Sequence, residues 1–317
     1  KDIVNKPYIH VTDNAVMNSY ILRSCYEHKV KNFIFFSCTV MLKSQKKPQT
    51  EKEFNLNNKI YPNYFGVGWT KIFIEKQCEF YSKISNTKFT VIRHSNIYGP
   101  HDKFDLEKSH FFGATINKVL NNKNGKIIVW GKGNEERDVL YIDDLIKFVG
   151  LSIKNQKKNY ELFNCGYGKS FKVIDIIKKI VKFSKKKIVI ENDLTKKSLS
   201  TYLSLNCAKS KKVIGWEKKI SIDKGILKKI VDLVKIKDET ILEVGPGTGN
   251  LTSFILEKEP KQLLVVEKDN ELVSILNKNF DKKITIINED ILKVNEKDIS
   301  KNPIVVFGNL PYNISTE

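Results

Sequence analysis

Two hydrophobic patterns alternate along the first two thirds of the chain. Over residues 13–30 apolar residues recur at helical spacing, whereas residues 33–36 form a short apolar run that ends in Ser37. The first pattern is typical of an amphipathic helix and the second of a buried strand. We expect further helices over residues 63–84, 109–121 and 143–153, strands over 89–92 and 127–130, and a loop over 96–100. Strands that alternate with helices in this way predict a parallel, doubly wound sheet.

The same alternation begins again near residue 225, where an apolar run leads into a glycine-rich loop. We expect strands over residues 240–244, 262–266, 284–287 and 304–307, and helices over 226–234, 251–257 and 271–279. The predicted fold class is α/β, with two partial Rossmann-like doubly wound parallel sheets in tandem. The predicted domains are residues 1–225 and residues 226–317.

Composition narrows the class of protein. The 317 residues are 41% hydrophobic and 29% charged, which is ordinary for a globular protein, and no apolar stretch approaches the ~18 residues of a spanning helix. The first residues lack the apolar segment of a signal peptide. The five cysteines are scattered without a CxxC pair, which favours reduced thiols over disulfides or a metal site. We therefore expect a cytoplasmic protein with no membrane partner.

The net charge of +19 is unevenly distributed. Residues 226–317 contain 13 basic and 15 acidic residues, whereas residues 1–225 contain 42 basic and 21 acidic residues. The basic excess thus lies in the part without a nucleic-acid motif, in runs such as Lys185-Lys186-Lys187. Solvated lysine-rich faces are the favoured interpretation, and a binding patch is the alternative.

Three strand ends in the second half carry residues suited to an adenosyl ligand. Glycines in the loop Glu243–Gly249, which follows a strand and opens a helix, allow close approach of a ligand to backbone N–H groups. Glu267 ends the second strand, where its carboxylate can accept both hydroxyls of a ribose. Asp290 ends the third strand and can accept a hydrogen bond from an adenine amine. A GxGxG loop alone also suits dinucleotide-binding folds, and each acid alone suits a solvated strand end or helix cap.

The run Gly308–Ser315 follows the fourth strand and suits chemistry on an adenine amine. That amine is a poor nucleophile because its lone pair is delocalised into the ring. The side-chain oxygen of Asn309 and a backbone carbonyl of the loop can accept its hydrogen atoms and localise the lone pair. Tyr312 can stack on a base flipped out of its helix, and Pro311 fixes the loop so that the acceptors are preorganised.

Residues 226–317 resemble the ribosomal small-subunit RNA adenine dimethyltransferase family in these runs. The resemblance implies methyl transfer from S-adenosylmethionine to adenine in small-subunit rRNA, with rRNA as the partner. The implied cofactor-binding residues are Glu243, Gly245, Gly247, Glu267, Asp290 and Asn309, and the implied catalytic residues are Asn309, Pro311 and Tyr312. The family's leading segment is replaced by other sequence, and the chain stops before the family's later strands, so we expect a half-built site.

The first half contains several runs of a second family. They are Ser37-Cys38-Thr39-Val40 after a strand, Lys71 on the long helix, the loop Arg93–Pro100, the segment 101–110, the run Arg137–Asp144 and the pair Gly215-Trp216. These runs resemble the extended short-chain dehydrogenase/reductase family, nearest to nucleotide-sugar epimerases and reductases of the GDP-fucose synthase kind. The resemblance implies NAD or NADP as cofactor and a nucleotide-sugar as ligand. It implies catalytic roles for Ser37, Lys71 and His110, and substrate contacts for Asn96 and Arg137.

The first half also departs from that family. Hydride transfer in the family uses a tyrosinate four residues before the lysine, and here that position is Val67. Tyr64 lies one helical turn earlier, on a similar face. No GxxGxxG precedes residue 14, so we expect weak dinucleotide binding or none.

We infer, as a hypothesis, a chimera of two enzyme fragments that join at residues 220–226. The predicted function is a nucleotide-sugar epimerase/reductase-like fragment fused to an rRNA adenine dimethyltransferase fragment, both weak or inactive. A non-catalytic binding or structural protein on a Rossmann scaffold is the alternative. Open sheet edges would favour self-association.

Overall fold

A computed structural model describes residues 6, 8–100, 111–184, 186–196, 201–295, 299 and 303–308. The chain separates into two compact units. Unit 1 comprises residues 1–117, 127–177 and 190–222, and unit 2 comprises residues 118–126, 178–189 and 223–317. Trp69, Trp130 and Trp216, the three tryptophans of the chain, all belong to unit 1. Tryptophan fluorescence therefore reports on unit 1 alone.

The central sheet of unit 1 is parallel, with the strand order β1-β2-β6. Its strands are β1 (Asn32–Phe36), β2 (Lys88–His94) and β6 (Tyr160–Cys165). In the register, Phe35 pairs with Val91, and Val91 pairs with Leu162. Both faces of β2 are covered, so its apolar residues are consecutive instead of alternating with polar ones, as expected for a buried parallel strand.

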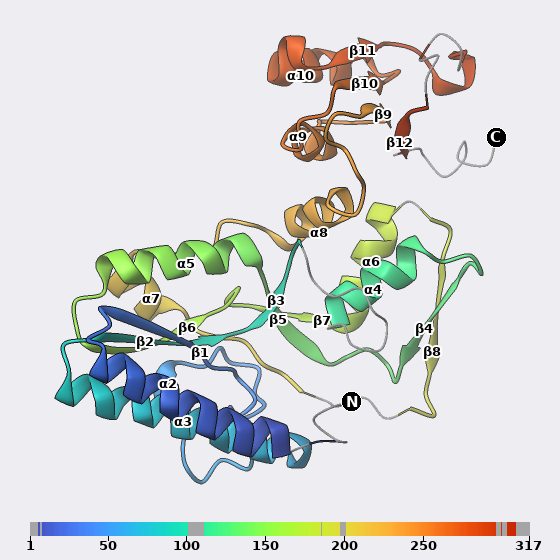
Figure 1. The fold of residues 1–317 in the computed structure, drawn as a ribbon. Helices are drawn as coiled ribbons and strands as arrows, with labels where there is room; N and C mark the ends of the chain where they lie inside the picture. The colour runs from blue at the N-terminus through green and yellow to red at the C-terminus, as the bar shows by residue number, and fades with distance from the viewer. Residues whose placement is uncertain are drawn as a thin grey trace. The chain divides into compact units, whose positions relative to one another are not determined.

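Helices cover both faces of this sheet (Figure 1). α2 (Asn14–Glu27) and α3 (Phe65–Ile84) cover one face, and α5 (Ile142–Asn155) and α7 (Ala208–Ile214) cover the other. Side chains alternate along β2 accordingly: Phe89 and Val91 pack with Ile74 of α3, whereas Ile92 packs with Phe148 and Trp216. The predicted doubly wound arrangement is confirmed for unit 1.

Two further sheets have three and two strands. β5 (Glu136–Tyr141) pairs in parallel with β3 (Asn96–Tyr98) and antiparallel with β7 (Ser170–Lys172). A second pair consists of β4 (Lys126–Trp130) and β8 (Val189–Asp193), and the accompanying helices are α4 (Phe111–Leu120) and α6 (Val173–Ser184). The loop predicted over residues 96–100 is therefore wrong at its start. Three residues are too few to show a strand period, and their partner strand lies about forty residues away in the chain.

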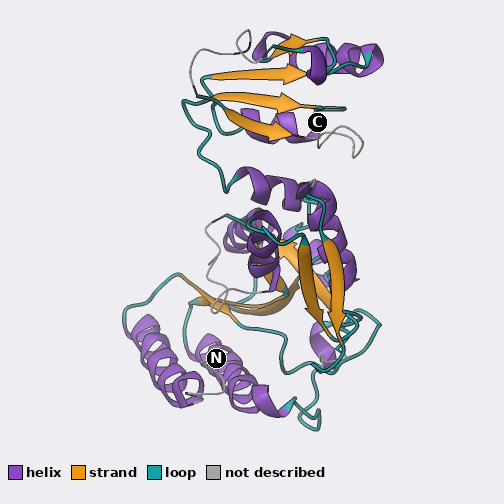
Figure 2. Ribbon diagram, turned by 90° about the vertical axis from the view of Figure 1, so that its right-hand side faces the viewer, coloured by secondary structure: helices purple, strands orange, loops and turns teal. Residues whose placement is uncertain are grey.

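The sheet of unit 2 has the order β11-β10-β9-β12, and all its strands are parallel (Figure 2). The strands are β9 (Thr240–Val244), β10 (Gln262–Val266), β11 (Thr285–Ile287) and β12 (Val305–Gly308). In chain order this is 3-2-1-4, the first part of a doubly wound sheet. Helix α8 (Ile222–Val231) precedes β9, α9 (Asn250–Leu256) connects β9 to β10, and α10 (Asn270–Phe280) connects β10 to β11.

Period-two alternation divides the core of unit 2 between the two faces of its sheet. Ile241 and Val265 pack with Phe254 of α9 and Leu276 of α10 on one face. On the other face Leu242, Val244, Leu264 and Val266 pack against the segment that follows β11. No helix among the described residues is long and apolar enough to cross a membrane.

Candidate functional site

A glycine loop links β9 to α9 in unit 2. Gly245, Gly247 and Gly249 have φ angles of +68°, +59° and +82°, a region that favours glycine. The N–H of Gly245 donates to the carbonyl of Val266 (2.9 Å), which fixes the loop against the end of β10. No heavy atom of the described residues lies within 4 Å of the position that a Cβ on Gly247 would occupy. The loop is therefore open to a ligand at Gly247.

Glu267 connects this loop to the end of β10. Its carboxylate accepts the N–H of Gly247 (3.3 Å) and the N–H of Asp269 (3.1 Å), and the residue is only 8% exposed. Each carboxylate oxygen has two acceptor sites, so one on each oxygen stays available for a ligand hydroxyl. Predicted cofactor-binding residues 247 and 267 are thus brought together.

Asp290 follows the neighbouring strand β11. One of its oxygens accepts the N–H of Leu292 (3.2 Å), and the other lies 3.6 Å from the Lys268 ammonium. The Asn288 side chain donates to the Glu267 carbonyl (3.0 Å), which ties the two strand ends together. Because carboxyl ends of parallel strands share one edge, Glu267 and Asp290 both border the loop edge of the sheet.

Glu243 lies on the helix-facing side of β9. It is fully buried, and the Thr252 hydroxyl of α9 donates to its Oε2 (2.7 Å), while Oε1 has no hydrogen-bond partner within the described residues. Burial raises the pKa of Glu243 to about 7. In this structure the Glu243 carboxyl joins the end of β9 to α9, on either side of the glycine loop. Its contact with a cofactor stays a prediction.

A titration follows from Glu243. The Glu243 carboxyl binds its proton more tightly in the folded protein than in the unfolded chain, where its pKa is about 4.5. The free energy of unfolding of unit 2 should therefore fall as the pH rises from about 4.5 to about 7, and then level off. The loss should be about 3 kcal/mol and should be absent in Glu243→Gln. Urea unfolding followed by far-UV circular dichroism measures this loss of stability. The transition of unit 2 is the one that circular dichroism shows and tryptophan fluorescence does not. An unchanged pH slope in the variant would contradict the assignment.

Asn309, Pro311 and Tyr312 lie outside the described residues, as does His110. β12 ends at Gly308, which pairs with Val244 at the end of β9. The strand that precedes the predicted catalytic run therefore ends at the same sheet edge as the glycine loop.

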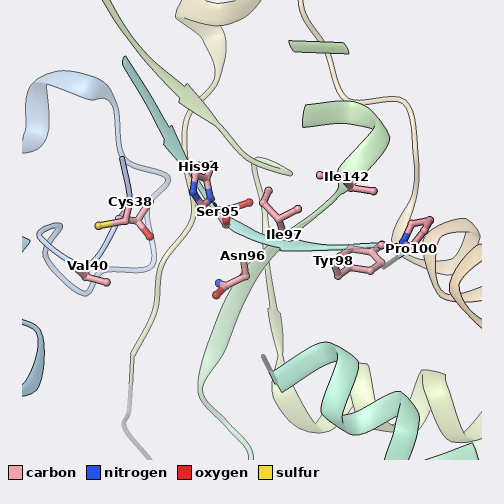
Figure 3. A pocket seen from close by; sticks show the side chains of 11 residues that line it. Cys38, Val40, His94, Ser95, Asn96, Ile97, Tyr98, Pro100 and Ile142 are labelled. Atoms are coloured by element: carbon pink, nitrogen blue, oxygen red, sulfur yellow. Dashed lines mark hydrogen bonds between the residues drawn. The ribbon is translucent and has the colours of Figure 1, made fainter. Parts of the chain in front are cut away.

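Two cavities lie side by side in unit 1, because Thr39, Val40 and Asn96 line both. The first has a volume of about 450 Å³ and the second of about 400 Å³, within the usual range for ligand pockets. Figure 3 shows the first cavity, with Cys38 and Val40 on one side, Tyr98 and Ile142 on the other, and Asn96 between them on β3.

Asn96 and Arg137, which are both predicted to contact a substrate, line the second cavity. The Asn96 side chain donates to the Asp138 carbonyl (3.1 Å). Nη1 of Arg137 donates to the Thr201 hydroxyl and to the Glu136 carbonyl (3.1 Å), and burial lowers the pKa of its guanidinium. No local pattern indicates Thr201 as a partner of Arg137, because the two residues lie more than sixty positions apart in the chain.

Asp138 fixes the loops around these two residues. Its carboxylate is 1% exposed and accepts the N–H groups of Tyr167 (2.7 Å), Gly168 (3.1 Å) and Leu205 (3.1 Å). Burial raises the pKa of Asp138 to about 6. No pattern in the sequence indicates this role of Asp138, because its donors come from distant parts of the chain.

Ser37, a predicted catalytic residue, lines neither cavity. It is 1% exposed, and its hydroxyl donates to Oε1 of Glu75 (2.6 Å). The other oxygen of that carboxylate, Oε2, accepts from Nη2 of Arg93 (2.6 Å). Thr39, two residues further on, lines both cavities, and its hydroxyl makes no hydrogen bond within the described residues.

Lys71 also lines neither cavity. Its ammonium donates to the Phe36 carbonyl (2.9 Å) and lies 4.6 Å from the centre of the Phe35 ring. Burial lowers its pKa. The catalytic roles predicted for Ser37 and Lys71 are therefore not supported by a place in either cavity, and both stay predictions.

Known proteins match the two parts of the chain separately. Residues 3–166 match the NAD dependent epimerase/dehydratase family, and residues 209–317 match the ribosomal RNA adenine dimethylase family. Ribosomal RNA small subunit methyltransferase A of Pelagibacter ubique is 54% identical over 109 residues, which are 34% of this chain and 41% of that protein. The chain thus spans about two fifths of the length of this relative.

The first part has relatives of another kind. GDP-L-fucose synthase of Sinorhizobium fredii is 27% identical over 228 residues, which are 70% of this chain and 71% of that protein. Among solved structures, UDP-glucose 4-epimerase of Thermotoga maritima, determined with UDP-glucose, has a TM-score of 0.59 and 24% identity, covering 67% of this chain and 66% of that one. The structural likeness establishes the fold. Because residues 3–166 are more than half of the sequence, the chain belongs to the NAD dependent epimerase/dehydratase family, with a ribosomal RNA adenine dimethylase-like part at residues 209–317.

Proposed function

We propose that the chain carries two ligand sites, one for S-adenosylmethionine in unit 2 and one for a nucleotide-sugar in unit 1. The observation that carries the first is the hydrogen bond from Gly247 to Glu267, which joins the open glycine loop to a carboxylate at the adjacent strand end. The observation that carries the second is the meeting of Asn96 and Arg137 at one cavity.

The residues of unit 2 fit an adenosyl cofactor. The space beside Gly247 admits a ligand against the backbone, and the free acceptor sites of Glu267 suit the two ribose hydroxyls. Asp290 at the next strand end would accept the adenine amine. When bound, S-adenosylmethionine supplies an activated methyl group. We propose adenine in small-subunit rRNA as the acceptor, with Asn309, Pro311 and Tyr312 addressing the base.

The residues of unit 1 do not fit the hydride-transfer chemistry of the family. Position 67 is valine, and the Lys71 ammonium is bound to the Phe36 carbonyl instead of facing a cavity. These observations favour the second candidate function for unit 1, which is nucleotide-sugar binding without catalysis.

Replacing Glu267 by glutamine should weaken S-adenosylmethionine binding about tenfold or more. The variant loses the negative charge and turns an NH₂ group toward a backbone N–H, so one of the existing bonds is lost. Isothermal titration calorimetry on the full chain measures the change. Glu239→Gln is the matched control, because Glu239 pairs with Lys235 on the surface away from the loop. The proposal is wrong if the parent chain does not bind the cofactor or if both variants bind equally.

A further inference from the structure

The second cavity of unit 1 has the electrostatic character of an anion site. Arg137 and Lys59 line it, and no acidic residue is among its described lining residues. Glu135 is close enough to Arg137 to balance part of its charge, but it does not line the cavity. A cavity lined by two cations and by no described acidic residue favours a ligand with concentrated negative charge.

The Arg137 guanidinium is preorganised to bind such a ligand. Its Nη1 group is held by the Thr201 hydroxyl and the Glu136 carbonyl, so the plane of the guanidinium is fixed before a ligand arrives. Its Nε and Nη2 groups make no hydrogen bond within the described residues. A fixed guanidinium with free N–H groups matches the oxygens of a phosphate.

Tyr64 adds a second donor beside it. Tyr64 ends the short helical turn Pro62–Tyr64 directly before α3, and its side chain lines the same cavity near the Arg137 guanidinium. The Tyr64 hydroxyl makes no hydrogen bond within the described residues. Its ring packs against Tyr61, with 6.0 Å between the ring centres, which fixes its direction. Val67, at the position of the family's tyrosine, lines neither cavity.

We propose that Tyr64 is a second donor to the ligand's diphosphate, beside Arg137, the residue at which the family resemblance already places that group. This inference rests on the proposed nucleotide-sugar site and assigns Tyr64 a binding role there instead of the role of a base. The Tyr64 hydroxyl donates a hydrogen bond to one phosphate oxygen, and the Arg137 guanidinium binds a neighbouring oxygen with its free N–H groups. The recognised chemistry is a diphosphate, and both GDP and UDP carry it.

Calorimetric titration of the full chain with GDP, UDP, guanosine and inorganic pyrophosphate tests the proposal. Tyr64→Phe should lower the affinity for the two nucleotides and for pyrophosphate about tenfold, while guanosine binding stays unchanged, because only a bond to a charged acceptor is lost. Tyr61→Phe is the matched control, since Tyr61 lines the same cavity, and its affinities should stay those of the parent. Tryptophan fluorescence should show unchanged unfolding of unit 1 in both variants.

The outcomes separate this inference from the proposed function. If the parent binds GDP or UDP but Tyr64→Phe binds equally well, or if Tyr61→Phe weakens binding as much, the role of Tyr64 is refuted while the site stands. If pyrophosphate binds with the expected dependence on Tyr64 but no nucleotide binds more tightly than pyrophosphate, the donor pair stands and the nucleotide-sugar site fails. If none of these ligands binds the parent, both are refuted.

Discussion

Replacing Glu75 by leucine should lower the free energy of unfolding of unit 1 by about 3–5 kcal/mol, because it leaves a buried guanidinium without its partner. Glu75 and Arg93 form an ion pair in which both side chains are 4% exposed. The pair has two contacts, Nε to Oε1 at 3.0 Å and Nη2 to Oε2 at 2.6 Å. The Ser37 hydroxyl would lose its acceptor as well.

Urea unfolding followed by tryptophan fluorescence measures this loss, since all three tryptophans lie in unit 1. The double variant Glu75→Leu, Arg93→Leu is the control. Two apolar side chains in place of a buried pair are often neutral, so most of the lost stability should return. A single variant as stable as the parent, or a double variant no better than the single one, would contradict the importance of the pair.

Replacing Gly249 by alanine should destabilise unit 2 by about 2–5 kcal/mol and abolish cofactor binding, because two costs combine at this residue. Its φ of +82° is unfavourable for a residue with a Cβ. A Cβ would also stand 2.2 Å from Cε2 of Phe280, a ring that packs against the core of unit 2. Either α9 or the ring must move, and the glycine loop moves with α9.

Gly247→Ala is the matched control for the loss of stability alone, because Gly247 itself belongs to the proposed cofactor site. Gly247 also has a positive φ, +59°, but a Cβ there would meet no atom of the described residues within 4 Å. Only the backbone cost of about 1–2 kcal/mol applies. Hydrogen exchange of the backbone amides in residues 240–266, measured by mass spectrometry, reports both changes. Equal protection in the two variants would show that the contact with Phe280 does not matter.

The sequence predicted those elements whose pattern is local. The buried strands at 89–92 and 240–244 were evident because an apolar run of this length between polar turns is distinctive. The strand at 96–98 was not, because three residues form it only by pairing with β5. The domain boundary at residues 225 and 226 stays a prediction, and α8 runs from 222 to 231 across it.

The residues of the candidate sites were likewise predictable only where their pattern in the sequence is local. Gly247 and Glu267 were predictable because a strand, a loop and the next strand end occur within a short stretch of chain. Ser37 was singled out by its place after a strand, but the direction of its hydroxyl depends on Glu75, thirty-eight residues away. The group of Tyr64, Arg137 and Thr201 forms only when three distant segments fold together. No spacing in the sequence predicts that these residues lie close to one another.

Successive titration of one sample of the full chain with S-adenosylmethionine and then with GDP tests the two-site claim most directly. We predict two separate binding isotherms. Glu267→Gln should weaken the first alone, and Arg137→Gln should weaken the second alone, because each residue belongs to a unit with its own core. The claim is contradicted if neither ligand binds, or if one substitution weakens both isotherms equally.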